Sequence, residues 1–248
     1  AATARGRARA PATAGLASPV LWGKTACALL LADGPRATQA VQAVTALREA
    51  IDARASTTAA AVLLQQRAWL MHWALVALPQ GDGGVALIAE MFASDGYVNV
   101  IQSLCPHLLR YLAATVLMSP RKRSALQELV KLVRLLRRDH SDAITSLVED
   151  LYFHASFDDA QKRLAECATA LAKDWFLANM TDAFMSAARL HIFESYCRIH
   201  SRISLSALGA KLGMEDGAAE KWIAKMISGA QLNASIASAS GQVLFGNK

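Results

Sequence analysis

The stretch that decides the fold spans residues 203–246 and has the sequence ISLSALGAKLGMEDGAAEKWIAKMISGAQLNASIASASGQVLFG. Its first part repeats leucine at helical spacing between a capping residue and a closing glycine: Ser204, Leu205, Leu208, Leu212 and Gly213. A second apolar stripe follows Asp216 and ends before Gly229: Ala219, Trp222, Ile223, Met226 and Ile227. Residues 232–236 then alternate, residues 238–241 supply turn chemistry, and residues 243–245 return as a strand. Two helices and a hairpin predict a winged helix.

The sequence before this stretch has helical period almost throughout and almost no strand period. Five apolar stripes are expected to face the core: Val41, Val44, Leu47 and Ile51; Val62, Trp69, Trp73 and Val76; Leu126, Leu129, Val130, Val133 and Leu136; Ile144, Leu147, Val148 and Leu151; Ala160, Leu164, Cys167 and Leu171. Ser141 and Asp158 are expected to cap the last two helices, and Pro106 fits the first turn of another. A longer helix is expected over residues 181–200. The pattern predicts a mainly α fold, a right-handed stack of antiparallel helix pairs capped by the winged helix.

Three parts are expected along the chain. Residues 1–20 carry three arginines and no acid in an Ala/Pro-rich stretch, which predicts a disordered or irregular lead. Residues 21–178 are the expected helical repeats, and residues 179–248 are the expected linking helix and winged helix. No run reaches the roughly 18 uncharged apolar residues of a membrane span, so no membrane partner is expected.

Positive charge is concentrated in one segment. The chain has a formal net charge of +6, and residues 121–138 hold seven of its 26 lysines and arginines against the single acid Glu128. A localised basic strip favours contact with phosphate or with an acidic protein surface, and a solvated helix face is the alternative. The candidate contact residues are Arg121, Lys122, Arg123, Lys131, Arg134 and Arg138.

Motifs of catalysis and of cofactor or metal binding are missing from the sequence. It has no HExxH, GxSxG, GxxxxGK[ST] or GxGxxG, and its four cysteines form no CxxC pair. Cys197 and His200 lie three residues apart on an expected helix, but no acid is placed to orient them. We therefore expect no enzyme, cofactor or metal, and we expect the cysteines to be reduced core residues.

The predicted winged helix has two possible uses. Lys221 and Lys225 are the weaker candidates for nucleic-acid contact, because their helix lacks the Arg, Asn and Gln that bind base edges. A strand with an unpaired edge can instead extend the sheet of a neighbouring protein. The expected subunit interface is this edge, formed by Gln242, Val243, Leu244 and Phe245.

Several blocks of the sequence resemble a known family. They are LQQR at 64–67, WLMHW at 69–73, IQSLCPHLLRYL at 101–112, FESYCRIH at 193–200 and the closing Gly246 and Asn247. In order and spacing, from about residue 21 onward, they resemble the e subunits of eukaryotic translation initiation factor 3, a family of PCI-domain proteins. Family chains carry more helical sequence before this region, so the chain is expected to be a C-terminal fragment. The Ala/Arg-rich opening and residues 81–84 depart from the family pattern.

The resemblance implies a function that the composition alone does not. A PCI domain consists of helical repeats followed by a winged helix, and family members are cytoplasmic, non-catalytic scaffolds. They associate with the c, l and d subunits and the scaffold factor 4G, and they dock on the small ribosomal subunit, where contact with ribosomal RNA is possible. A PCI subunit of the proteasome lid or COP9 signalosome, and a winged-helix nucleic-acid-binding regulator, remain as alternatives.

Overall fold

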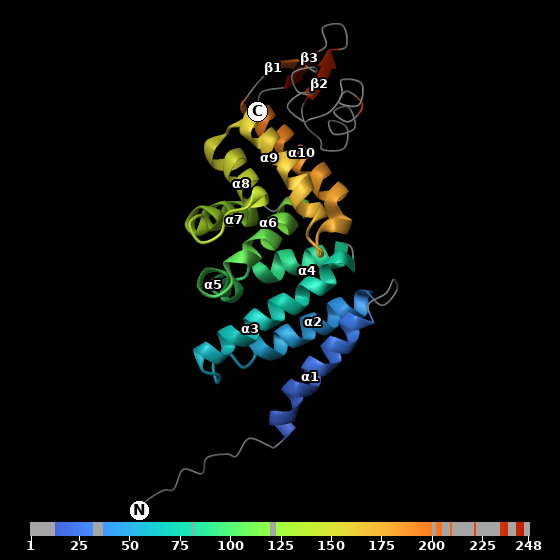
Figure 1. The fold of residues 1–248 in the computed structure, drawn as a ribbon, viewed down its shortest axis with the longest axis vertical. Coiled ribbons are helices and arrows are strands. Elements are labelled where there is room, and N and C mark those ends of the chain that lie inside the picture. Colours follow the sequence, from blue (N-terminus) through green and yellow to red (C-terminus); the bar gives the residue numbers. More distant parts are fainter. Residues whose placement is uncertain are drawn as a thin grey trace, which may run out of the picture. The chain divides into compact units, whose positions relative to one another are not determined.

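The computed structural model describes residues 13–31, 37–80, 82–119, 123–199, 202–204, 209, 221, 234–237 and 242–245. Helices dominate the described ranges, and three short strands lie near the end (Figure 1). This confirms the predicted mainly α fold. The elements are α1 (Thr13–Leu30), α2 (Ala37–Asp52), α3 (Ala60–Ala74), η2 (Leu75–Gln80), α4 (Asp82–Phe92), α5 (Asp95–Ser103), η3 (Pro106–Leu108), α6 (Leu109–Met118), α7 (Arg123–Leu136), α8 (Ala143–Glu149), η4 (Asp150–His154), α9 (Phe157–Ala172), η5 (Ala178–Met180), α10 (Thr181–Ile199), β1 (Arg202–Ser204), β2 (Ala234–Ala237) and β3 (Gln242–Phe245).

The chain divides into two compact units, residues 1–88 and residues 89–248. In the first unit, α2 packs against both α1 and α3, and the three helices lie side by side in Figure 1. Val44, Leu47 and Ile51 of α2 are fully buried, which confirms most of the stripe expected on that helix. No single helix within the described ranges is long and apolar enough to cross a membrane.

Helix α1 corrects the expected irregular lead. It begins at Thr13, so residues 13–20 are helical, while residues 1–12 lie outside the described part of the chain. Alanine has the highest helix propensity, and packing on α2 adds tertiary support that outweighs the cost of Pro19 inside the helix. Thr25 of α1 is buried, and its hydroxyl donates to the carbonyl oxygens of Leu21 and Ala43 at 2.8 and 3.3 Å.

Helix α3 buries a different face from the one expected. Its buried residues are Leu63, Ala68, Leu70, Met71 and Ala74. Val62, Trp69 and Trp73 are instead 45%, 58% and 37% exposed, so the prediction of a core stripe through these residues is wrong. Apolar residues surround α3 on most sides, and such a helix does not indicate by periodicity alone which side faces the core.

The glycine-rich sequence at residues 81–84 predicts a loop, but α4 already begins at Asp82. A Cβ on Gly84 would overlap the carbonyl oxygen of Ala77 in η2 and lie 2.9 Å from its carbonyl carbon. A Cβ on Gly83 would meet only a methyl group of Val41, at 3.8 Å. Glycine at residue 84 therefore allows the first turn of α4 to approach the backbone of η2 closely.

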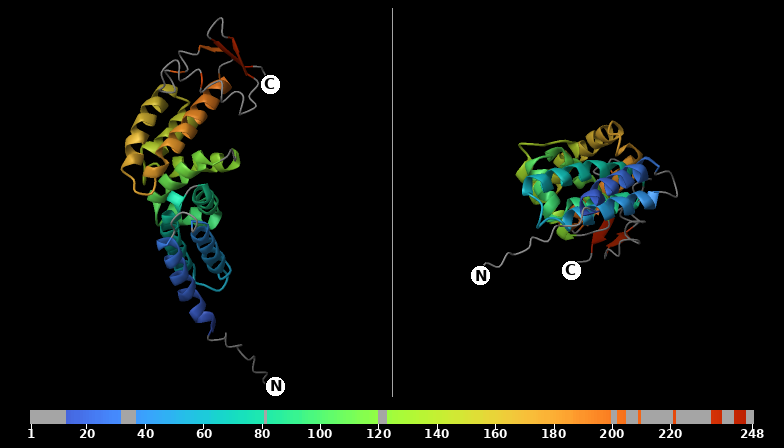
Figure 2. Two further views of the ribbon diagram at one scale, coloured as in Figure 1. Left: turned by 90° about the vertical axis from the view of Figure 1, so that its right-hand side faces the viewer. Right: turned by 90° about the horizontal axis from the view of Figure 1, so that it is seen from below.

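The second unit is built around α6, where all residues from Leu112 to Leu117 are buried. Pro106 occupies the first position of η3, which leads directly into α6, as predicted. Helices α7, α8 and α10 pack against α6, and α9 and α10 lie side by side in Figures 1 and 2. The expected core stripe of α9 is confirmed, because its buried residues are Ala160, Leu164, Cys167 and Leu171.

The caps of α8 and α9 differ from the expected ones. Asp142, not Ser141, is the N-cap of α8: its Oδ1 accepts from the backbone N–H of Thr145 at 2.8 Å, and its own N–H donates to Thr145 Oγ1 at 2.9 Å. This reciprocal pair is a capping box. Helix α9 has Ser156 at its N-cap, and Asp158 lies one residue into the helix.

Candidate functional site

The three described strands form one antiparallel sheet in the order β1–β3–β2. In one pair, Ala234 of β2 lies opposite Phe245 and Ala237 lies opposite Gln242, which confirms the predicted hairpin. In the other, Arg202 of β1 lies opposite Leu244. The two helices expected between the strands lie outside the described residues, except for single helical positions at Gly209 and Lys221.

The sheet order corrects the expected open edge. Gln242, Val243 and Leu244 pair on both sides, with β1 and with β2, and Phe245 pairs with β2. β3 is therefore the central strand and cannot accept a neighbour's strand, so the edge assigned to it is wrong. The cause is β1, whose three residues Arg-Ile-Ser are too short to show strand alternation in the sequence. The described sheet ends at β1 on one side and at β2 on the other.

The candidate basic residues differ in what they contact. Lys131 pairs with Glu128 at 2.7 Å between two exposed side chains. The Arg134 guanidinium lies over the ring of Phe153, 4.5 Å from its centroid. Arg138 is exposed and makes no ion pair with the described residues. Lys221 is exposed. Arg121, Lys122 and Lys225 lie outside the described residues, and Arg123 is the first residue of α7.

Sequence reasoning did not identify the aromatic partner of Arg134. Phe153 belongs to η4, a π-helical turn that continues α8, and it is 47% exposed. The turn ends at Ala155, whose φ of 51° is in the left-handed region. A π turn adds one residue to a helical turn and so changes the side to which the next side chains point. No local signal marks such a turn, although Phe153 follows the buried residues Ile144, Leu147 and Val148 of α8.

Buried Glu149 lies close to two more exposed side chains, those of Arg137 and His154. Its carboxylate lies 3.0 Å from Arg137 and 3.7 Å from His154. The ring of His154 in turn lies against Phe153, with 4.8 Å between the ring centroids. The C-terminal end of α7 is therefore connected to α8 and η4 by one ion pair and one cation–π contact, and Arg134 and Phe153 are held at the surface.

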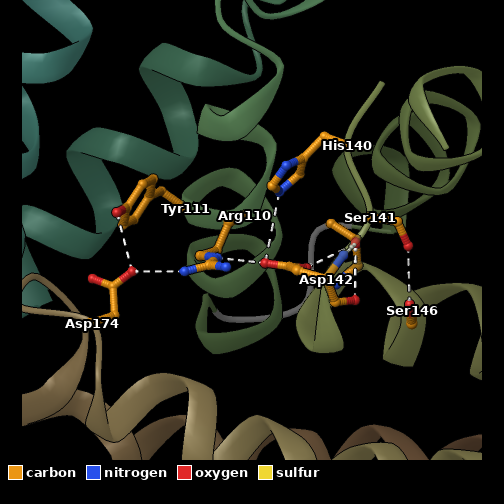
Figure 3. Close-up of polar contacts among 8 residues, drawn as sticks. Arg110, Tyr111, His140, Ser141, Asp142, Ser146 and Asp174 are labelled. Atoms are coloured by element: carbon orange, nitrogen blue, oxygen red, sulfur yellow. Dashed lines mark hydrogen bonds and ion pairs between the residues drawn. The ribbon is translucent and has the colours of Figure 1, made fainter. Parts of the chain in front are cut away.

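A second polar network lies at the N-terminal end of α8 (Figure 3). Arg110 of α6 donates to Asp142 at 2.5 Å and to Asp174 at 3.2 Å. The Tyr111 hydroxyl donates to Asp174 at 3.1 Å, and His140 lies 3.7 Å from Asp142. The network links α6 to the start of α8 and to the segment between α9 and η5.

Burial and charge determine the ionisation of this network. Burial alone would raise the pKa of Asp142, but nearby His140 and hydrogen bonds from Thr145 and Arg110 outweigh it and hold the pKa well below its usual range. Burial, followed by the charge of Asp174, raises the pKa of Tyr111 to about 12. Asp142 is therefore ionised and Tyr111 neutral at neutral pH, as their hydrogen bonds require.

The described cysteines differ in exposure. Burial raises the pKa of Cys105, and it raises the pKa of Cys167 to about 12, so these two thiols are protonated and poorly nucleophilic near neutral pH. Cys27 is exposed, which corrects the expectation that all four cysteines are core residues. The side chains of Cys197 and His200, the pair weighed for catalysis, lie outside the described part of the structure.

Comparison with known proteins agrees with this architecture. Residues 164–247 match the PCI domain family. The chain is 40% identical over 230 residues to the E-1 subunit of eukaryotic translation initiation factor 3 from Drosophila willistoni, a match that covers 92% of the chain and 52% of that protein. The E subunit from Aedes aegypti is 39% identical and the E subunit from Drosophila ananassae 40% identical over the same lengths.

The chain thus spans about half the length of the curated relatives it matches. The identity extends over nearly the whole chain, and the PCI match covers all of α10 and all three described strands. The chain is therefore a homologue of the E subunits of eukaryotic translation initiation factor 3 and has a PCI domain at residues 164–247.

Proposed function

We propose that this chain is part of a non-catalytic scaffold subunit of eukaryotic translation initiation factor 3. The observation that carries the proposal is the identity of about 40% with E subunits over 92% of the chain, together with the PCI domain. Two protonated, buried thiols and the absence of catalytic sequence motifs are consistent with a scaffold role.

The proposed mechanism is multivalent docking, in which several modest surfaces on one chain position neighbouring subunits. The proposed partners are the c, l and d subunits, the small ribosomal subunit and the scaffold factor 4G, in the cytoplasm. The basic residues of α7 and of the turn after it are the proposed docking surface for the initiation complex. As expected from the sequence, we propose residues 21–178 as the repeat part and residues 179–248 as the linking helix and winged helix.

Strand addition, if the sheet is used for assembly, must involve an outer strand. We assign it to β2, because in the described sheet its four residues offer a longer outer edge than the three of β1. Residues 242–245 would then support the interface by holding β2 in place. Proline at Leu244 would break the sheet itself, so it cannot test the edge.

Proline substitutions in β2 test this assignment. Successive backbone N–H groups of a strand point to opposite sides, and proline has no N–H group. Of the two variants Ser235→Pro and Ile236→Pro, one therefore loses a hydrogen bond to β3. The other loses only an N–H group on the outer edge of β2. We expect the variant that keeps its native circular dichroism to lose co-assembly with other PCI subunits, while Ser235→Ala assembles normally. Normal assembly of the folded proline variant would contradict β2 as the interface.

The function itself is tested by affinity purification of the full-length protein from its own cells, with its stoichiometric partners identified by mass spectrometry. Recovery of the other initiation-factor subunits and of small ribosomal subunits is the expected result. Stoichiometric recovery of proteasome lid or signalosome subunits, or of no PCI subunit at all, would overturn the proposal.

A further inference from the structure

The outer side of α7 and the turn that follows it combine exposed cations with exposed apolar side chains. Arg134 and Arg138 are exposed, Leu135 is 65% exposed, and Phe153 of η4 contacts Arg134. We name these four residues the α7 platform. Exposed apolar patches rimmed by charged residues mark interaction sites, and two large apolar side chains are exposed here beside two arginines.

Helix geometry places three of these residues on one side. Each residue of a helix is rotated by about 100° around the helix axis, and the turn after α7 roughly continues this rotation. Arg134 and Arg138 are therefore one turn apart, and Leu135 lies three residues before Arg138. The three side chains fall within about 100° of one another around the axis. The opposite side is the core side, where Leu129, Leu132, Val133 and Leu136 are buried. Leu135 therefore remains outside the core because the buried face of α7 is already filled.

Phe153 is held at the surface by its surroundings. It lies in a π turn that ends in the left-handed Ala155, the arginine covers its ring, and His154 contacts it. π turns and residues in unfavourable backbone regions are frequent at functional sites. An aromatic ring ordered in advance loses little conformational entropy when a partner covers it.

The local charges favour an acidic protein segment over RNA. Lys131 and Arg137 are already paired with Glu128 and Glu149. Arg134 contacts a neutral ring, and neither it nor Arg138 has an ion pair among the described residues, so two uncompensated cations remain about one helical turn apart. A single strand of RNA is bound best along a continuous row of cations, whereas two cations flanked by apolar side chains match an amphipathic helix with acidic flanks.

We propose that the α7 platform binds an acidic amphipathic helix of another protein. Carboxylates one turn apart on that helix pair with Arg134 and Arg138, and its apolar side chains cover Leu135 and Phe153. The proposal rests on the proposed function for its biological setting. It adds the class of partner that the docking surface binds.

Binding of defined probes to the whole chain tests the proposal. The probes are a fluorescent synthetic helix with leucines on one face flanked by glutamates, the same peptide with glutamine for every glutamate, and oligouridine. Fluorescence anisotropy should show that the chain binds the acidic peptide about tenfold or more tightly than the glutamine peptide, and that salt weakens this binding. Arg134→Glu with Arg138→Glu should reduce its affinity at least about tenfold.

Two further variants separate the platform from general charge effects. Phe153→Ala leaves the charge unchanged and should still weaken peptide binding severalfold. The matched control is Lys162→Glu with Lys173→Glu, two exposed lysines of α9 and its C-cap that are not part of the platform and give the same change in charge. It should weaken binding less than twofold. Arg138→Gln alone, which removes no described contact, serves if the double variant fails to fold.

Three results would overturn the proposal. They are equal losses in the platform and control variants, no difference between the acidic and glutamine peptides, and tighter binding of oligouridine that depends on Phe153, which would assign the platform to nucleic acid. Because the assay uses the chain alone, its failure leaves the purification result for the proposed function unaffected.

Discussion

The guanidinium Nε of Arg110 in α6 donates to Oδ2 of Asp142, the N-cap of α8, at 2.5 Å. The same carboxylate accepts the backbone N–H of Thr145 through its other oxygen. One side chain therefore caps a helix and binds a neighbouring helix at the same time. The stability of the second unit should be sensitive to this residue.

Replacing Asp142 with Asn should destabilise the chain by about 1–3 kcal/mol, because half-buried Arg110 loses a charge-assisted hydrogen bond and keeps only Asp174 as a charged partner. Denaturant unfolding followed by circular dichroism measures this change. The matched control is Ser141→Ala at the neighbouring, exposed residue, whose hydroxyl lies 3.4 Å from that of Ser146. It should change stability by less than about 0.5 kcal/mol. A larger effect at Ser141 than at Asp142 would contradict the cap assignment.

The contribution of the Asp142 carboxylate to the free energy of unfolding should depend on pH. The folded-state pKa of Asp142 is below its value in the unfolded chain, so the unfolded state binds the proton more readily. The stabilisation is therefore complete above about pH 4 and is lost as the pH falls below it. Unfolding curves of the native chain and of Asp142→Asn should converge toward low pH. A stability difference that stays constant from neutral pH to about pH 2 would refute this linkage.

Ala155 has a φ of 51°, and Gly adopts this conformation without a Cβ penalty. Ala155→Gly is therefore expected to stabilise the chain by about 0.5–1 kcal/mol. Ala165, an exposed alanine inside α9, provides the opposite case, because glycine there should destabilise by about 1 kcal/mol. Thermal melts of both variants measure the two signs, and destabilisation by both would argue against the left-handed backbone at Ala155.

Alanine substitutions at Gly84 and Gly83, in the first unit, should have different effects on stability. Gly84→Ala should destabilise by about 1–3 kcal/mol, because its methyl group would overlap the backbone of Ala77 in η2. Gly83→Ala has room for its methyl group and should be neutral or stabilising by a few tenths of a kcal/mol. Both changes are measured by denaturant unfolding, and equal effects would show that α4 and η2 do not approach as closely as described.

Helical periodicity predicted some elements well and failed for others. The stripe of α9 was confirmed residue by residue, because that helix has one apolar side and one polar side. The stripe of α3 was wrong, because apolar side chains surround that helix and only its packing determines that Leu70 is buried and Trp69 exposed. The resemblance to E subunits was confirmed by 40% identity over 92% of the chain.

The sequence by itself determined the helical class, the hairpin of β2 and β3, and the concentration of positive charge around α7, because each depends on neighbouring residues. Only the tertiary structure determined that β1 pairs with β3, that Arg110 contacts Asp174 from 64 residues away, and that Arg134 covers Phe153. These contacts depend on chain segments that meet only after folding. The choice of edge strand and the composition of the α7 platform therefore could not follow from local pattern.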